Sequence, residues 1–146
     1  MPERRVIYTW GYGDSRTFED LLNALPEELR RPGWTIFMDV RRSRGSRNPS
    51  WHCGDRAFPP AFYTEAARRQ YVWLYGLGTS GEAGPGVWLP AYGEWLRREQ
   101  MLDAAREVRR YRTAVLICAE QNHRRCHRTQ VAALLAEWTG AEVVHL

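Results

Sequence analysis

The sequence predicts a single α/β domain in three layers, with a mainly parallel sheet of about five strands and helices on both faces. Two observations carry this prediction. Short apolar runs typical of strands alternate with helical patterns along the whole chain, and right-handed crossovers then make the strands parallel. The chain is 146 residues long, a length that suits one domain, so we place residues 1–146 in one unit.

The first third of the chain is expected to form a strand, a helix and a second strand. Residues 5–10 are rich in β-branched and aromatic side chains, which favour a strand. Thr17 and Asp20 have the spacing of a capping pair, and the leucines that follow recur at helical spacing. We therefore expect a helix over residues 18–30, followed by the second strand at residues 34–40.

The middle of the chain alternates between loops and apolar segments. Residues 41–57 have little hydrophobic pattern and predict a long loop, and loops of this length are usually functional or disordered. A short helix is expected at residues 60–70. Residues 71–77 form a nearly continuous apolar run, which is typical of a strand buried on both faces. Residues 78–86 are rich in glycine and predict a loop.

The last third begins with a long helical pattern over residues 91–112. The phase of its apolar side slips between Leu96 and Met101, so we expect a kink or two consecutive helices. The remaining elements, a strand, a helix and a strand, are expected at residues 113–118, 126–139 and 141–146.

Composition limits the classes of function. The formal net charge is +4, and all 21 basic residues are arginine. An arginine-favouring genome explains this, and so does recognition of anions, which arginine binds bidentately. Three cysteines are too few for a disulfide framework. No apolar run approaches the about 18 residues of a membrane span, and the charged start is unlike a signal peptide. We expect a cytoplasmic protein without a membrane partner.

In parallel α/β folds, ligands bind outside the carboxyl ends of the strands, so the segments after the strands are the candidate site. Gly11, Tyr12 and Gly13 follow the first strand. Glycines there let the backbone turn sharply and let a ligand approach closely. The nearby start of the next helix could hold an anion. The alternative is an ordinary tight turn.

The second strand ends in an acid and a run of arginines. Asp39 lies inside an apolar run, where an unpaired charge is costly, and Arg41 points the same way if the strand continues. Five arginines and one acid occupy residues 41–56. This segment, which includes Arg44, fits contact with phosphate or nucleic acid, or else a solvated surface loop.

The densest reactive cluster follows the fourth strand. Cys118 and Glu120 end the strand, and Cys126, His127 and Arg128 lie at the start of the next helix. In one interpretation Cys126 is a nucleophile that Glu120 or His127 assists. In a second, the helix start and its arginines bind an oxyanion while Cys126 packs.

A zinc site is the third interpretation of this cluster. Cys118, His123, Cys126 and His127 match no standard closed zinc pattern. They would have to converge from a strand end, a loop and adjacent helix positions whose side chains diverge. We therefore expect no metal. Cys118 and Arg124 also have the spacing of phosphatase loops, but the bulky residues between them favour an accidental match.

These motifs together resemble the Domain of Unknown Function 488 family. The resemblance begins with the residues from Thr9 to Gly13 and with the segments 39–41 and 46–48, and it continues at residues 74–78. Its most specific part pairs Cys118-Ala119-Glu120 with Cys126-His127-Arg128, and residues 142–146 complete it. The resemblance implies a compact prokaryotic α/β domain without an assigned activity. It implies a site with the members Gly11, Tyr12, Asp39, Arg41, Glu120, Cys126, His127 and Arg128.

The expected function is a pocket for a phosphate-bearing ligand, a nucleotide or nucleic acid, in an enzyme or in a protein derived from one. We expect Glu120, Cys126, His127 and Asp39 to be the catalytic candidates. The ligand-binding candidates are Gly11, Tyr12, Gly13, Arg41, Arg44 and Arg128. The alternative is a noncatalytic module that binds nucleic acid or another partner through the arginine-rich segment 41–56.

Overall fold

Five parallel strands form the central sheet of the protein. The computed structural model describes residues 4–30, 33–41, 45–53, 58–64, 67, 70–74, 77, 86–89, 94–122 and 126–146. The strands lie in the order β3-β2-β6-β1-β7, and every pair is parallel. Their bounds are β1 (Val6–Gly11), β2 (Thr35–Asp39), β3 (Tyr71–Trp73), β6 (Thr113–Cys118) and β7 (Glu142–His145). The predicted α/β fold class is confirmed.

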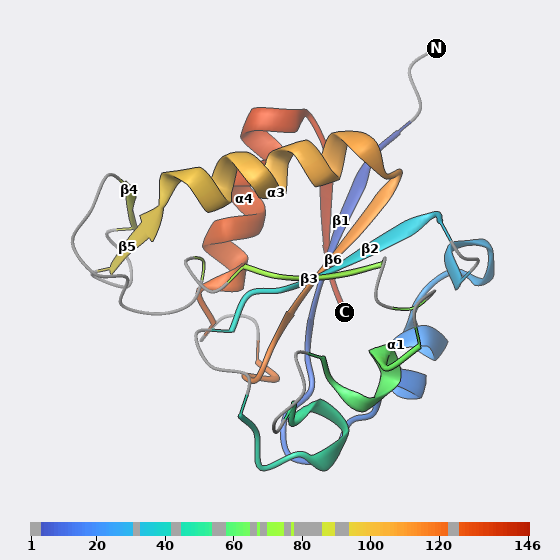
Figure 1. Ribbon diagram of the computed structural model, residues 1–146. Helices are drawn as coiled ribbons and strands as arrows, with labels where there is room; N and C mark the ends of the chain where they lie inside the picture. The colour runs from blue at the N-terminus through green and yellow to red at the C-terminus, as the bar shows by residue number, and fades with distance from the viewer. Residues whose placement is uncertain are drawn as a thin grey trace.

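Helices cover both faces of this sheet. Figure 1 shows α3 (Arg98–Arg110) and α4 (Arg128–Thr139) side by side on one face. The opposite face carries α1 (Phe18–Ala24) and the short 3₁₀ turns. These turns span Glu27–Arg30, Pro49–Trp51 and Pro60–Phe62. The result is the expected three-layer arrangement.

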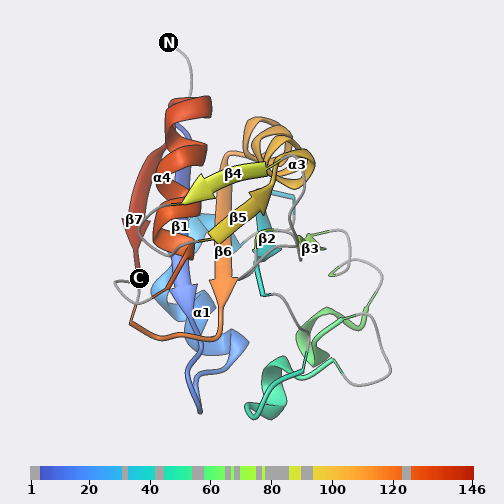
Figure 2. The ribbon, with the colours of Figure 1, turned by 90° about the vertical axis from the view of Figure 1, so that its left-hand side faces the viewer.

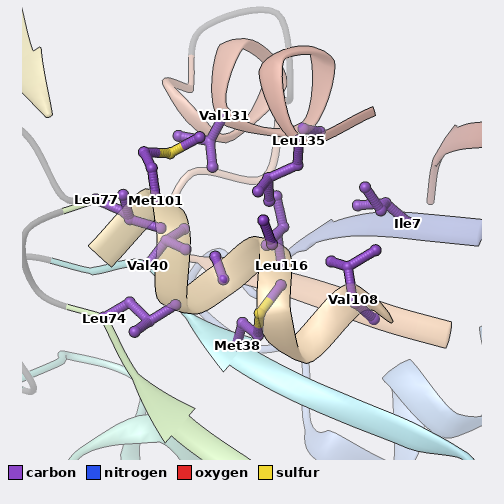
Figure 3. Packing of buried hydrophobic residues seen from close by; sticks show 14 of the residues in the cluster. Ile7, Met38, Val40, Leu74, Leu77, Met101, Val108, Leu116, Val131 and Leu135 are labelled. Atoms are coloured by element: carbon purple, nitrogen blue, oxygen red, sulfur yellow. The ribbon is translucent and has the colours of Figure 1, made fainter. Parts of the chain in front are cut away.

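Alternation along the strands divides the buried side chains into two cores. On β2, Ile36 and Met38 pack with α3 and α4, whereas Phe37 between them packs against the other face. Figure 3 shows the first core, where Met101 and Val108 of α3 meet strand side chains. The second core is aromatic, and rings such as Phe37 and Phe62 lie 5.6 Å apart. A sheet buried on both faces explains why its strands read as continuous apolar runs.

The first helix is shorter than predicted. Its N-terminus is the expected capping box, because Thr17 accepts from the backbone N–H of Asp20 and the Asp20 carboxylate accepts from that of Thr17. The helix ends at Ala24, because the residue before a proline favours an extended backbone and Leu25 precedes Pro26. The leucine pattern continues into the 3₁₀ turn that follows.

The long helix predicted over residues 91–112 is wrong in its first part. Residues of β5 (Glu94–Arg97) pair antiparallel with β4 (Gly86–Leu89), and α3 starts only at Arg98. The phase slip between Leu96 and Met101 therefore marks a change from strand to helix, not a kink. Of the helix predicted at residues 60–70, the structure shows a 3₁₀ turn over Pro60–Phe62 and helical backbone at residue 67, while residues 65, 66, 68 and 69 lie outside the described residues.

All five strands of the central sheet point the same way, so their carboxyl ends share one edge. Figure 2 shows the arrows of β1, β6 and β7 ending toward the same side, with the chain after β6 passing the end of β1 before it enters α4.

The last helix, α4, is capped by Gly140, whose φ of 76° is the left-handed conformation of a helix C-cap. None of the helices in the described ranges could span a lipid bilayer.

Candidate functional site

The segments after β1 and β6 are joined by their backbones at the carboxyl edge. The N–H of Tyr12 donates to the Cys118 carbonyl at 3.1 Å, and that of Gly13 donates to the Ala119 carbonyl at 3.0 Å. A Cβ on Gly11 would lie 1.8 Å from the Glu120 carbonyl oxygen. Gly11 is therefore required for the approach of two backbones, whereas the sequence suggested the approach of a ligand.

Asp39 and Arg41 form the buried ion pair that the sequence predicts. The Arg41 Nη2 lies 2.6 Å from the Asp39 carboxylate, and Nε donates to both carboxylate oxygens. The Arg41 backbone N–H and the Tyr71 hydroxyl also donate to this carboxylate. The Asp39 side chain is fully buried and that of Arg41 is 4% exposed. Burial and the neighbouring Asp39 raise the pKa of Tyr71 far above its ordinary value.

Arg41 uses its whole guanidinium on protein groups. Besides Asp39, its Nη1 donates to the Tyr12 hydroxyl at 3.1 Å and to the Trp51 carbonyl at 2.8 Å, and its Nη2 contacts Cys53 Sγ at 3.8 Å. Arginine has five N–H donors, and these contacts engage all of them. Arg41 therefore fixes the loop after β2 to the loop after β1 and offers no donor to a ligand.

Arg128 is also buried, with 0% exposure. Its Nη1 donates to the Glu120 carbonyl and its Nη2 to the Gln121 carbonyl at 3.1 Å, while its Nε has no hydrogen-bond partner. The ion pairs found among the described residues do not include it. Arg128 thus holds the chain that leaves β6, and its predicted contact with an anion stays a prediction.

A cleft of about 420 Å³ opens where these loops meet. It is lined by residues 12–14 after β1, residues 45–48 after β2 and residues 119–121 after β6. Among the described residues that line it, the charged side chains are Arg47, Asp14 and Glu120, all of them exposed. The Glu120 carboxylate accepts from the Asn122 N–H at 3.1 Å, which holds it at the rim.

The loop of residues 45–51 is fixed beside this cleft by contacts that sequence reasoning missed. The Asn48 amide and the Trp51 indole N–H both donate to the Arg16 carbonyl, at 2.8 and 3.0 Å. The Trp51 ring stacks on Tyr12 with centroids 5.3 Å apart. Arg47 is consequently presented to the cleft. Its place in the predicted arginine run and in the segment 46–48 of the family resemblance are the signals that could have singled it out.

Cys118, Cys126 and His127 converge beneath this edge. Their sulfur and imidazole ligand atoms all lie within 4.8 Å of one another, and the three side chains are buried. The expectation that they diverge is wrong for these three residues. Cys126 precedes the N-cap His127 instead of lying in the first turn of α4, so helical spacing does not separate their side chains.

The contacts of His127 define the orientation of its imidazole ring and the ring nitrogen that carries the hydrogen. Its Nε2 lies 3.1 Å from the Val40 carbonyl oxygen, which can only accept, so Nε2 carries a hydrogen. Its Nδ1 then faces Cys126 Sγ at 3.8 Å. The pKa of the Cys126 thiol is lowered because the Cys118 thiol donates to its sulfur and His127 adds a further contact. The same sulfur–sulfur contact and burial raise the pKa of Cys118.

Several predicted positions lie outside the described residues. These are Arg44 of the ligand-binding candidates, His123 of the zinc interpretation and two further arginines of the 41–56 segment, namely Arg42 and Arg56. Within the described part of that segment, Arg41 is buried and Arg47 is exposed. The alternative of a basic nucleic-acid surface therefore stays a prediction.

The fold and the cleft define a small parallel α/β protein with its candidate site at the carboxyl edge of the sheet. The family model "Domain of unknown function DUF488" matches residues 21–135, which is well over half of the chain. The chain therefore belongs to this family, as the sequence motifs indicated. No curated protein and no solved structure matches it.

Proposed function

We propose that the cleft at the carboxyl edge binds a small phosphate-bearing molecule of the nucleotide or phosphosugar class. The observation that carries this proposal is the joint lining of one cleft by the three loops that follow β1, β2 and β6. Its volume of about 420 Å³ falls within the range of small-molecule sites, about 300–1,000 Å³. Loops at this edge are where parallel α/β proteins bind ligands.

The charges of the cleft favour a ligand that carries more than a phosphate. Arg47 is the exposed cation among the described residues that line the cleft, and it supports contact with a phosphate. Asp14 and Glu120 would repel a bare anion, but they accept hydrogen bonds from hydroxyl or amino groups. A nucleotide or a phosphosugar combines both kinds of group. The ligand contacts predicted for Tyr12 and Gly13 remain part of the proposal, since both residues line the cleft.

Roles within the proposed site follow from exposure. Glu120 is the catalytic candidate that a ligand can reach, and it would accept a proton from a bound hydroxyl group. Asp39 is buried in its ion pair with Arg41, so both act as positioning residues for the loops. Arg128 has the same role through the carbonyls it holds after β6.

A thermal-shift screen of nucleotides and phosphosugars tests the binding proposal. A ligand found in this screen should bind Arg47→Ala at least about tenfold more weakly, since a charge-assisted hydrogen bond contributes about 1.5–3 kcal/mol. The loss should shrink as salt rises, because exposed ionic contacts are screened. Arg106→Ala on α3 is the matched control, since Arg106 is also exposed but is not among the residues that line the cleft.

Glu120→Gln separates binding from catalysis. If the site is catalytic, this variant should retain ligand binding and lose turnover of the bound ligand, which phosphorus NMR can follow. Equal binding by wild type, Arg47→Ala and Arg106→Ala would show that the ligand lies elsewhere. A screen without a single stabilising ligand would contradict the proposal itself.

A further inference from the structure

We infer that Cys118, Cys126 and His127 form a binding site for a zinc-class divalent metal ion beneath the carboxyl edge. The inference goes beyond the proposed cleft ligand and stands on different side chains. The three ligand atoms come from the end of β6 and the start of α4, and they lie within 4.8 Å of one another.

The separations fit a single ion. Tetrahedral zinc with typical zinc–sulfur and zinc–nitrogen bonds places its ligand atoms about 3.5–3.8 Å apart. Cys126 Sγ and His127 Nδ1 are 3.8 Å apart, so they already have this spacing. Cys118 Sγ lies within 4.8 Å of both, and a side-chain adjustment of about 1 Å would bring it to the same spacing.

The imidazole is oriented as metal-binding histidines are. Such a histidine almost always donates its second ring N–H to a carboxylate, a backbone carbonyl or water, which fixes its tautomer. The His127 Nε2 has this contact with the Val40 carbonyl at 3.1 Å. In its neutral form, with the hydrogen on Nε2, His127 directs the lone pair of Nδ1 toward Cys126. A bare dithiol or a disulfide would not require this orientation.

Donor chemistry identifies the class of ion. Two thiolates and one imidazole select zinc and similar soft or borderline metals, whereas magnesium and calcium prefer oxygen ligands. A dication with two thiolates is electrically neutral, so it suits a buried position. Each thiol that is still protonated releases its proton to water on binding. Three protein ligands are also the number that catalytic zinc sites use when a fourth position takes water or substrate.

Metal uptake by the untagged, reduced chain tests this inference. Zinc equilibration followed by exchange into metal-free buffer should leave about one zinc per chain by mass spectrometry, the stoichiometry of a single site. Cobalt(II) should give tetrahedral d–d bands and thiolate charge-transfer bands. Cys118→Ser and Cys126→Ser should each lose stoichiometric uptake. Cys53→Ser is the matched control and should keep it, since Cys53 is equally buried but outside the cluster.

A second measurement does not depend on folding of the serine variants. In the wild-type chain, zinc should protect Cys118 and Cys126 from alkylation and leave the labelling of Cys53 unchanged. Wild-type protein that takes up no zinc and gives no cobalt bands would overturn the inference. So would metal uptake that persists in both serine variants, or a native disulfide between Cys118 and Cys126.

Discussion

Replacing Asp39 with asparagine should destabilise the protein more than any conservative change at its surface. The carboxylate accepts from the Arg41 side chain, the Arg41 backbone and the Tyr71 hydroxyl, and its side chain is fully buried. Asp39→Asn leaves the Arg41 cation buried without its anion. Breaking a buried pair in this way costs about 3–5 kcal/mol, a large part of the about 5–15 kcal/mol by which domains are stable.

The exposed pair between Asp103 and Arg106 provides the control. Its charged atoms are 3.9 Å apart, and both side chains are more than half exposed. Solvent screens such a pair, so Asp103→Asn should change the free energy of unfolding by less than about 1 kcal/mol. Urea denaturation of both variants beside wild type measures the difference through the midpoint and the slope.

A double variant tests the cause of the loss. Arg41→Met removes the stranded cation, so Asp39→Asn combined with Arg41→Met should be no less stable than Asp39→Asn alone. This holds although the bond from Arg41 to the Trp51 carbonyl is also lost. If the free energy of unfolding of Asp39→Asn lies within about 1 kcal/mol of the wild-type value, the reasoning is refuted, because a buried cation without its anion should destabilise the fold by more than that.

Three further predictions concern two glycines, Gly11 and Gly33, and the first helix. Gly11→Ala should cost about 3 kcal/mol or more in urea denaturation, because its Cβ would lie 1.8 Å from a backbone oxygen. Gly33→Ala, with φ of 86° and open space around it, should cost only the about 1–2 kcal/mol of the left-handed backbone. The pKa of Asp20 should lie below its ordinary value, because the backbone and hydroxyl of Thr17 donate to it. A lowered carboxyl pKa adds stability that is present above the unfolded pKa and is lost as pH falls through the folded one. Carbon NMR titration of the carboxyl checks this, and an ordinary pKa would show that the capping box does not persist in solution.

Local patterns were sufficient to predict most of the sheet. Each of its five strands overlaps a predicted apolar run. A sheet covered on both faces buries every side chain of the inner strands β2 and β6, whereas the edge strand β7 stays partly exposed. The sequence analysis missed the hairpin of β4 and β5. These two short strands lie outside the central sheet, and short strands of this kind have a weak hydrophobic pattern. The start of α3 was visible only as the phase slip between Leu96 and Met101.

The candidate site was predicted in part. The strand-end rule placed Tyr12, Gly13 and Glu120 at the edge, and all three line the cleft. The sequence also indicated that Asp39 needs a partner. It did not show that Arg41 would be fully engaged by protein groups, because its contacts with Trp51 and Tyr12 arise only when two loops meet.

The sequence by itself determined the order and type of the main elements and the need to compensate a buried acid. These follow from short-range periodicity and from the high cost of unpaired charge in an apolar run. Tertiary structure alone decided which groups a ligand or an ion can reach. Cys118 and Cys126 are brought together only because β6 and α4 meet at one edge, and Arg128 is buried by that same junction. Contacts between residues from different elements depend on packing in three dimensions, and no local pattern encodes that packing.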